Sequence, residues 1–139
     1  MSETQEKNTA RGLLTLWFEE EFALGRCDAW ERFLAPDVEV TTARGEVLAT
    51  LADWCAAYTR NVNDRPLAGA VATATFAEGP QKAALFWMAT DENGGPVHGA
   101  FLAESDAGRI AKLLCLESNP ATQASSEDDG ALPDGNWWF

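Results

Sequence analysis

The first half of the chain places its apolar residues at helical spacing in three separate stretches. Residues 9–25 form a broad apolar arc typical of an amphipathic helix, and Gly25 is suited to end it because glycine readily adopts the left-handed conformation of a helix C-cap. A shorter helix is predicted over residues 28–34, ahead of Pro36, which cannot continue it. A third helix is predicted over residues 48–62. The pattern therefore predicts three N-terminal helices.

The second half of the chain changes to the alternating pattern of β-strands. Its strand-like runs are separated by short segments rich in Gly, Pro, Asn and Asp, which are the residues of tight turns. Consecutive hairpins of this kind form an antiparallel meander, and long strands with one apolar face curve around the helices that cover them. One more strand, rich in β-branched residues, is predicted before the third helix. We therefore expect an α+β fold with strands at 38–42, 70–77, 82–90, 97–104 and 109–117.

The length of 139 residues is that of one domain. We expect a single α+β domain over residues 9–118, preceded by a flexible N-terminus at residues 1–8. From residue 119 to residue 139 the composition becomes small, polar and acidic, which is typical of a mobile tail. This tail ends in aromatic residues whose exposure to water is unfavourable, Trp137-Trp138-Phe139.

The charge balance narrows the range of partners. Ten basic and 22 acidic residues give a net charge of −12, which argues against a nucleic-acid backbone or an anionic membrane as a partner. No apolar signal-peptide core is visible, and no run approaches the ~18 apolar residues of a membrane-spanning helix. The three cysteines are widely spaced and there is one histidine, so the sequence does not predict a zinc site. We expect reduced, mostly buried cysteines in a cytoplasmic protein.

Two segments of the chain carry a resemblance to a known superfamily. Residues 22–40 (FALGRCDAWERFLAPDVEV) are similar to its opening pattern of a short helix, a Gly-Asp turn, a second helix and a first strand, and residues 107–113 (AGRIAKL) are similar to its last turn and strand. The order of elements over residues 9–118 resembles the nuclear transport factor 2-like superfamily, in its SnoaL-like and ketosteroid isomerase-like branch. The resemblance implies a cone-shaped, curved antiparallel sheet closed by the helices, a pocket inside the cone and commonly a homodimer.

The resemblance also locates the catalytic groups of a ketosteroid isomerase-like site. In such a site a carboxylate base stands on the first strand, a tyrosine on the first helix and a second carboxyl group on the sheet. Counted along this chain, these three positions fall on Thr42, Phe18 and Ala100. A hydroxyl such as that of Thr42 cannot accept a proton from carbon at useful rates unaided, so we do not expect isomerase chemistry of that type.

Two other residues are candidates for acid–base catalysis. His98 is the only histidine, a residue type suited to general acid–base catalysis, and shares a predicted strand face with Ala100, the face that matches the family's pocket side. Glu21 falls inside the apolar arc of the first helix, between Trp17 and Leu14, where desolvation favours the protonated acid. The alternatives are a partly exposed histidine beside a turn, and a glutamate that reaches an arginine or the solvent.

Further residues are candidates for lining the pocket. Tyr58, the only tyrosine, lies one helical turn after Trp54 and can donate a hydrogen bond into the cone. Glu117 ends the last predicted strand and either brings a carboxylate to one end of the pocket or remains solvated. The aromatic side chains suit either the core or a pocket for an apolar ligand. The predicted pocket residues are Phe18, Trp54, Tyr58, Trp87, Ala100 and Glu117.

The sequence supports two hypotheses from different functional classes. The first is a small-molecule pocket protein that binds an apolar, ring-containing ligand in the cone, as a lyase, isomerase or cyclase. We expect it to work without a cofactor, because the sequence contains no phosphate-binding loop, nucleotide-binding motif or paired-cysteine redox motif. The second is a non-catalytic dimeric interaction module, in which the Trp137-Trp138-Phe139 segment docks in a groove or in the mouth of a cone, either its own or a neighbour's.

Overall fold

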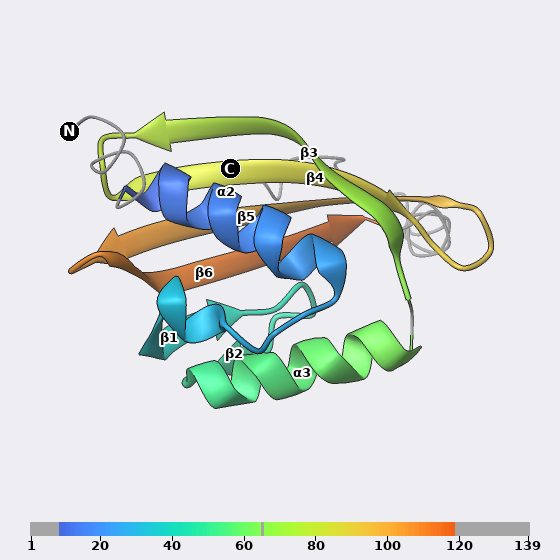
Figure 1. Cartoon of the computed structure of the whole chain (residues 1–139), viewed down its shortest axis with the longest axis horizontal. Helices are drawn as coiled ribbons and strands as arrows, with labels where there is room; N and C mark the ends of the chain where they lie inside the picture. Colours follow the sequence, from blue (N-terminus) through green and yellow to red (C-terminus); the bar gives the residue numbers. More distant parts are fainter. Residues whose placement is uncertain (1–8, 65, 119–139) are drawn as a thin grey trace.

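A curved sheet of six strands, with helices against one face, forms the framework of the chain (Figure 1). The computed structural model describes residues 9–64 and 66–118. The strands are ordered β2-β1-β6-β5-β4-β3. The helical elements are α2 (Ala10–Glu20), α3 (Leu51–Asp64) and two short 3₁₀ helices, η1 (Phe22–Leu24) and η2 (Trp30–Arg32). The strands are β1 (Leu34–Thr41), β2 (Val47–Leu48), β3 (Ala68–Glu78), β4 (Lys82–Thr90), β5 (Pro96–Asp106) and β6 (Arg109–Ser118).

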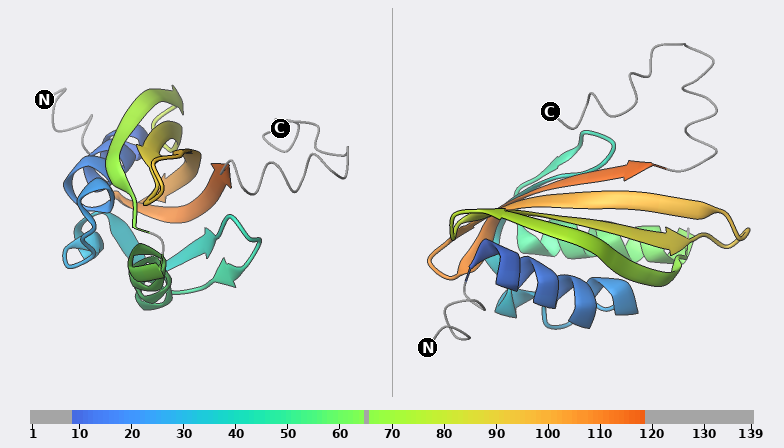
Figure 2. Two further views of the ribbon diagram at one scale, coloured as in Figure 1. Left: turned by 90° about the vertical axis from the view of Figure 1, so that its right-hand side faces the viewer. Right: turned by 90° about the horizontal axis from the view of Figure 1, so that it is seen from above.

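The two α-helices pack at different places on this framework. α2 packs against β3, β4, β5 and β6, whereas α3 packs beside β1 and β2. The curvature of the sheet and the separate positions of the helices are visible in the two turned views (Figure 2). The fold is therefore α+β, as the sequence predicts, and the helices of the described residues lie against one face of the sheet.

α2 forms where the sequence places a cap and an apolar stripe together. The Thr9 hydroxyl accepts a hydrogen bond from the Gly12 backbone N–H at 3.1 Å, which satisfies one of the unpaired donors at the helix start. The side chains that face the sheet are buried and recur at helical spacing, as the amphipathic pattern predicts. They are Leu13, Leu14, Trp17 and Phe18.

The predicted hairpins are present, and their turns have the expected chemistry. The four strands predicted in the second half of the chain lie within two residues of the observed bounds of β3, β4, β5 and β6. Ala107 and Gly108 join β5 to β6 with φ angles of 54° and 82°, the left-handed pair that a two-residue hairpin requires. Between β4 and β5 the Asp91 carboxylate accepts hydrogen bonds from the backbone N–H groups of Asn93 and Gly95, at 2.9 and 2.8 Å.

Two details of the predicted architecture are wrong. The predicted second helix is only the single 3₁₀ turn η2, so two of the three predicted helices are α-helices among the described residues. The segment is too short for more, since β1 already begins at Leu34. The sheet is mixed instead of antiparallel, because β1 pairs in parallel with β6. That pairing joins segments far apart in the sequence, and the local pattern does not specify its direction. The two-residue strand β2 is also not predicted from the sequence, because it is too short to show an alternating pattern.

The cysteine prediction also needs a correction. Cys27 and Cys55 form a disulfide, with their Cα atoms 6.0 Å apart, and Cys115 is free and buried. The folding of α3 against the loop before η2 brings the pair together across 28 residues of sequence, which the wide spacing hides. The argument for a cytoplasmic location from reduced cysteines therefore loses its support.

The remaining sequence predictions concern segments or properties outside these elements. The predicted N-terminal segment 1–8 and the tail 119–139, including Trp137-Trp138-Phe139, lie outside the described residues. None of the helices among the described residues is long and apolar enough to cross a lipid bilayer.

Gly99 of β5 allows the indole of Trp87 to lie flat against the sheet. Trp87 of β4 is its cross-strand partner and is only 4% exposed. A Cβ atom on Gly99 would overlap ring atoms of Trp87. The absence of a side chain at Gly99 therefore sets the position of the tryptophan ring.

Gly99→Ala is expected to lower the free energy of unfolding by about 1–3 kcal/mol, the usual cost of overpacking a core. Urea unfolding followed by fluorescence measures this change. In a Trp87→Leu background the same substitution should cost less, because the displaced ring is gone. An equal cost in both backgrounds would contradict the proposed contact.

Candidate functional site

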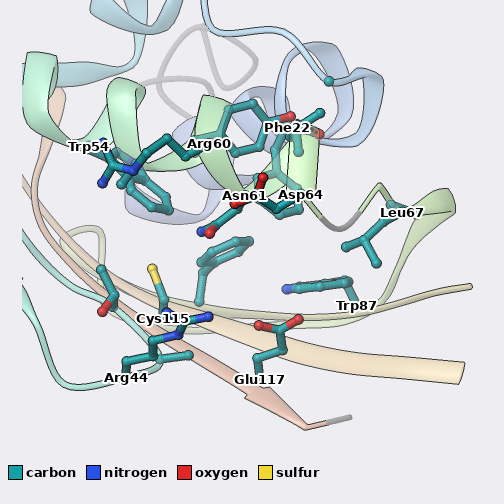
Figure 3. A pocket seen from close by; sticks show the side chains of 18 of the residues that line it. Phe22, Arg44, Trp54, Arg60, Asn61, Asp64, Leu67, Trp87, Cys115 and Glu117 are labelled. Atoms are coloured by element: carbon teal, nitrogen blue, oxygen red, sulfur yellow. Dashed lines mark hydrogen bonds between the residues drawn. The ribbon is translucent and has the colours of Figure 1, made fainter. Parts of the chain in front are cut away.

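A pocket of about 320 Å³ opens between α3 and the inner face of the sheet (Figure 3). Its wall combines the segment around η1, the loop between β1 and β2, α3 from Trp54 onward, the start of β3, the middle of β5 and the C-terminal parts of β4 and β6. Both apolar and charged side chains line it. The lining residues include Phe22, Thr42, Arg44, Trp54, Tyr58, Arg60, Asn61, Asp64, Leu67, Ala70, Trp87, Phe101, Cys115 and Glu117.

Aromatic rings form the apolar part of the pocket. The ring centroid of Phe22 lies 5.5 Å from that of Trp87 and 5.0 Å from that of Phe101, and the Trp87 and Phe101 rings stack at 6.1 Å. Trp54 lies on the α3 side, and Leu67 lies near Trp87 at the opposite end (Figure 3). Such a surface suits a flat, apolar ring compound, because rings gain from stacked and edge-to-face contacts.

Charged and amide side chains stand around this aromatic surface. Arg44 and Glu117 both lie on the sheet side, whereas Arg60, Asn61 and Asp64 come from α3 on the opposite side (Figure 3). Glu117 is partly buried, and the other four are exposed. The arrangement places hydrogen-bonding groups of both charges around an apolar interior, which is the usual composition of a small-molecule site.

Tyr58 connects α3 to the opposite part of the pocket wall. Its hydroxyl donates a hydrogen bond to the backbone oxygen of Phe22 at 2.7 Å. Burial and the negative charge of Glu21 raise the pKa of Tyr58 to about 12, with burial the larger cause; a backbone hydrogen bond with Gly25 acts in the opposite direction. Tyr58 therefore acts as a neutral hydrogen-bond donor at physiological pH.

Glu21 is buried, as its place in the apolar arc predicts, but it does not line the pocket. Its carboxylate oxygen Oε1 accepts a hydrogen bond from the Ala29 backbone N–H at 3.2 Å. Its own backbone N–H donates to the Trp17 carbonyl at 3.0 Å at the end of α2. Glu21 therefore stabilises the conformation of the segment that connects α2 to η2.

The structure places His98 outside the pocket. His98 is exposed, and its cross-strand neighbours are Met88 and Ser118. The strand pairing puts it on the outer face of the sheet, while its neighbour Gly99 contacts the inward Trp87 ring. The prediction that His98 and Ala100 share the pocket face is therefore wrong. β5 is apolar at successive positions, so alternation alone does not fix which residues point inward.

Of the six predicted pocket residues, Trp54, Tyr58, Trp87 and Glu117 line the pocket. Phe18 is in the core instead, 1% exposed and stacked on Phe22 at 5.4 Å. Ala100 is buried but does not line the pocket. The residues that the sequence analysis missed as pocket residues include Phe22, Arg44, Arg60, Asn61 and Phe101. Asn61 carried a usable signal, since it lies three residues, about one turn, beyond Tyr58 on the same predicted helix.

Three further groups limit the chemistry of the site. Thr42, at the position of the family's base, lines the pocket, and its hydroxyl accepts a hydrogen bond from the Glu46 backbone N–H at 3.2 Å. Burial, together with the charge of Glu117, raises the pKa of the Cys115 thiol, which keeps it neutral and unreactive. In the described part of the chain, no group of three or more His, Cys, Asp or Glu side chains is arranged to hold a metal ion.

Two tryptophans beside the pocket lack an acceptor for their indole N–H. Among the described residues, the buried Nε1 atoms of Trp54 and Trp87 have no hydrogen-bond partner. Leaving a buried donor unpaired costs free energy.

The pKa of Tyr58 gives a direct test of this part of the site. Tyr58 is the only tyrosine, so the ultraviolet absorbance of tyrosinate reports on it alone. Its midpoint is expected at about 12 instead of the ordinary 10. Because the unfolded chain loses this proton first, the contribution of Tyr58 to stability is complete below pH 10 and is lost as the pH rises towards 12.

Matched variants identify the cause of the shift. Glu21→Gln is expected to lower the Tyr58 midpoint because it removes a neighbouring negative charge, whereas Glu20→Gln, at an exposed position, is expected to leave it unchanged. A midpoint near 10 in a chain that circular dichroism shows to be folded would contradict the environment described for Tyr58.

The fold of the chain is similar to those of several proteins with solved structures. No protein-family model matches the sequence, and no curated protein matches it. A protein from Jannaschia sp. CCS1 described as a SnoaL-like polyketide cyclase has a TM-score of 0.69 at 14% identity, over 87% of this chain and 90% of that chain. A nuclear transport factor 2-like protein of unknown function from Burkholderia xenovorans has a TM-score of 0.65 at 19% identity, over 86% of both chains.

A third similar structure belongs to the ketosteroid isomerase-like proteins named in the sequence resemblance. A protein from Kribbella flavida described as a ketosteroid isomerase has a TM-score of 0.62 at 21% identity, over 78% of this chain and 76% of that chain. Likeness at these identities establishes the fold and leaves the activity to the site residues. The chain therefore has the nuclear transport factor 2-like fold, in the form shared by SnoaL-like and ketosteroid isomerase-like proteins.

Proposed function

We propose that the chain binds an apolar, ring-containing small molecule in the pocket under α3. The observation that carries the proposal is the aromatic surface of Phe22, Trp87 and Phe101, which faces a cavity of about 320 Å³. This volume is at the lower end of the range for small-molecule sites. The charged groups at Arg44 and Glu117 give such a ligand one polar end to align. The fold similarity to a protein described as a polyketide cyclase is in accord with a ring compound.

We further propose that Glu117 is the acid–base group of a cofactor-independent lyase, isomerase or cyclase reaction. It is a partly buried carboxylate of the pocket wall, and Arg44 lines the same side of the pocket (Figure 3). A carboxylate can take a proton from a carbon next to a carbonyl group, and a guanidinium that faces the same cavity can stabilise the oxyanion that develops on the ligand. His98 and Glu21 do not line the pocket, so Glu117 takes the role proposed for them from the sequence.

Ligand binding is tested with 2-naphthol, a two-ring compound with one hydroxyl group, in isothermal titration calorimetry. We expect one saturable site per chain. Ala70→Phe fills the pocket from β3 and is expected to abolish binding, whereas Ala74→Phe, on the outer face of the same strand, is expected to retain it. Equal loss in both variants, or binding that survives Ala70→Phe, would place the ligand elsewhere.

The catalytic part is tested with 2-tetralone, a two-ring ketone with exchangeable protons next to its carbonyl group. In deuterated water, nuclear magnetic resonance is expected to show faster loss of these protons with the protein than in buffer. Glu117→Gln is expected to slow the catalysed exchange about 100-fold or more, the usual contribution of a general base. Glu46→Gln, another acidic position of the wall, serves as the control. No difference between these two variants would remove Glu117 from the proposal.

An observation on the outer face of the sheet favours the second candidate function, a dimeric interaction module. Large apolar side chains are exposed there: Val71 at 53%, Phe76 at 59%, and Met88 and Leu114 at 38% each. A row of alternating charges borders them across five strands, because the pairing register aligns Glu78, Lys82, Glu104, Lys112 and Glu39. Within residues 9–64 and 66–118 none of these five forms an ion pair.

We propose that a second copy of the chain covers this outer face. Apolar area of this kind is unfavourable in water, and the alternating row lets lysines of one copy meet glutamates of the other although the chain carries −12 overall. Leu114→Glu is expected to convert a dimer into a monomer in light scattering after gel filtration. Val47→Glu, at an exposed apolar residue on β2, is the control. A wild-type monomer, or loss of the dimer in both variants, would contradict the proposal.

A further inference from the structure

A disulfide joins two parts of the pocket wall that come from different segments of the chain. One part lies within residues 22–25, around η1, and the other within residues 54–64 of α3. Cys27 follows the first part by two residues, and Cys55 belongs to the first half of α3. The bond therefore fixes the distance between the two sides of the wall at the end where they meet.

The other contacts of η1 and η2 with α3 are non-covalent and lie close to the same end. The Tyr58 hydroxyl donates a hydrogen bond to the Phe22 carbonyl at 2.7 Å, and the two rings lie 5.3 Å apart. The Trp30 ring of η2 contacts the rings of Tyr58 and Trp54 at 4.8 and 5.5 Å. The buried residues of α3 lie within its first eight positions, and beyond Tyr58 the partly buried Val62 packs against the core. The far end of the helix therefore has fewer contacts of its own and depends more on what holds the first part.

The bonded pair, Cys27 and Cys55, differs from the free Cys115 in how easily a reductant can reach the sulfur atoms. Cys27 and Cys55 are partly exposed, so a small dithiol can reach the bond. Cys115 is 7% exposed, and burial raises the pKa of its thiol, which keeps it out of thiol–disulfide exchange. A change in redox conditions therefore acts on one bond, at the pocket wall.

We infer that the Cys27–Cys55 disulfide is a redox latch that controls the ligand affinity of the pocket. The inference rests on the proposed ligand-binding function. A dithiol reduces the bond: one thiolate attacks a sulfur to form a mixed disulfide, and its second thiolate then displaces the protein. Two electrons and two protons pass to the protein, which gains two thiols, while the dithiol becomes a disulfide. α3 is then held to the η1 segment and the loop after it by non-covalent contacts alone, chiefly the Tyr58 hydrogen bond and the Phe22–Tyr58 ring contact.

Loss of affinity follows from the cost of ordering the wall. A ligand that binds between two segments held together finds its contacts in place, whereas after reduction it must also restrict the motion of α3. The oxidised form is thus the high-affinity form, and ligand binding in turn makes the disulfide harder to reduce, because the coupling is reciprocal.

The experiment compares the full chain before and after treatment with dithiothreitol, with 2-naphthol as the probe in calorimetry. A thiol assay in denaturant confirms that free thiols rise from one to three. We expect the dissociation constant to increase at least tenfold, to return on reoxidation with oxidised glutathione, and to be high at the outset in the Cys27→Ser/Cys55→Ser double variant. Cys115→Ala can bind the probe with a different affinity, because Cys115 lines the pocket. The ratio of its dissociation constants in the reduced and oxidised forms is expected to equal that of the wild type.

Hydrogen exchange of the backbone amides gives a second readout that needs no ligand. Reduction is expected to speed exchange in residues 51–64 of α3 at least tenfold, while residues 10–20 of α2 stay unchanged. If the oxidised chain binds no probe, the proposed ligand-binding function fails. The effect of reduction on hydrogen exchange in α3 then still tests whether the disulfide restrains that helix. Unchanged affinity in fully reduced protein, or α3 exchange that does not respond, overturns the latch. A general rise in exchange that includes α2 also overturns it, as loss of overall stability.

Discussion

Phe22 packs against aromatic rings of α2, α3 and the sheet at once, and the arrangement of the pocket depends on that packing. Its ring lies 5.4 Å from Phe18, 5.3 Å from Tyr58 and 5.0 Å from Phe101. Its backbone carbonyl accepts the Tyr58 hydrogen bond. Phe22 is held where the chain leaves α2, next to Glu21, whose buried carboxylate binds the Ala29 N–H. One short segment thus places the helix, the pocket wall and the sheet relative to one another.

The two faces of the sheet have different roles because they meet different environments. The inner face carries Gly99 and Phe101 on β5, against which Trp87 and the helices pack. The outer face carries exposed apolar side chains and the charged row that crosses the strands. A strand exposes alternate residues to each face, so β5 serves the pocket on one side and the proposed contact between copies on the other. His98 belongs to that second surface.

The chemistry proposed for the site differs from the template of the ketosteroid isomerase-like branch. Thr42, the residue that the sequence resemblance aligns with the base, accepts a hydrogen bond from the Glu46 backbone N–H, so it contributes to the turn after β1. Of the carboxylates in the wall, Glu117 at the end of β6 is the partly buried one, whereas Glu46 and Asp64 are exposed. The proposed acid–base group thus stands on a different strand from the base of that template, on a fold that can carry different sites.

The sequence by itself determined the α+β class, the α2 stripe and the hairpins of β3 to β6, because periodicity and turn residues act locally. It also indicated Trp54, Tyr58, Trp87 and Glu117 as pocket residues. Only the tertiary structure decided the parallel pairing of β1 with β6, the Cys27–Cys55 bond and the inward face of β5. Each of these depends on segments distant in sequence. No local sequence pattern specifies whether two strands pair in parallel or which cysteines come close together. Nor does it specify which residues of a strand point inward when both of its faces are apolar.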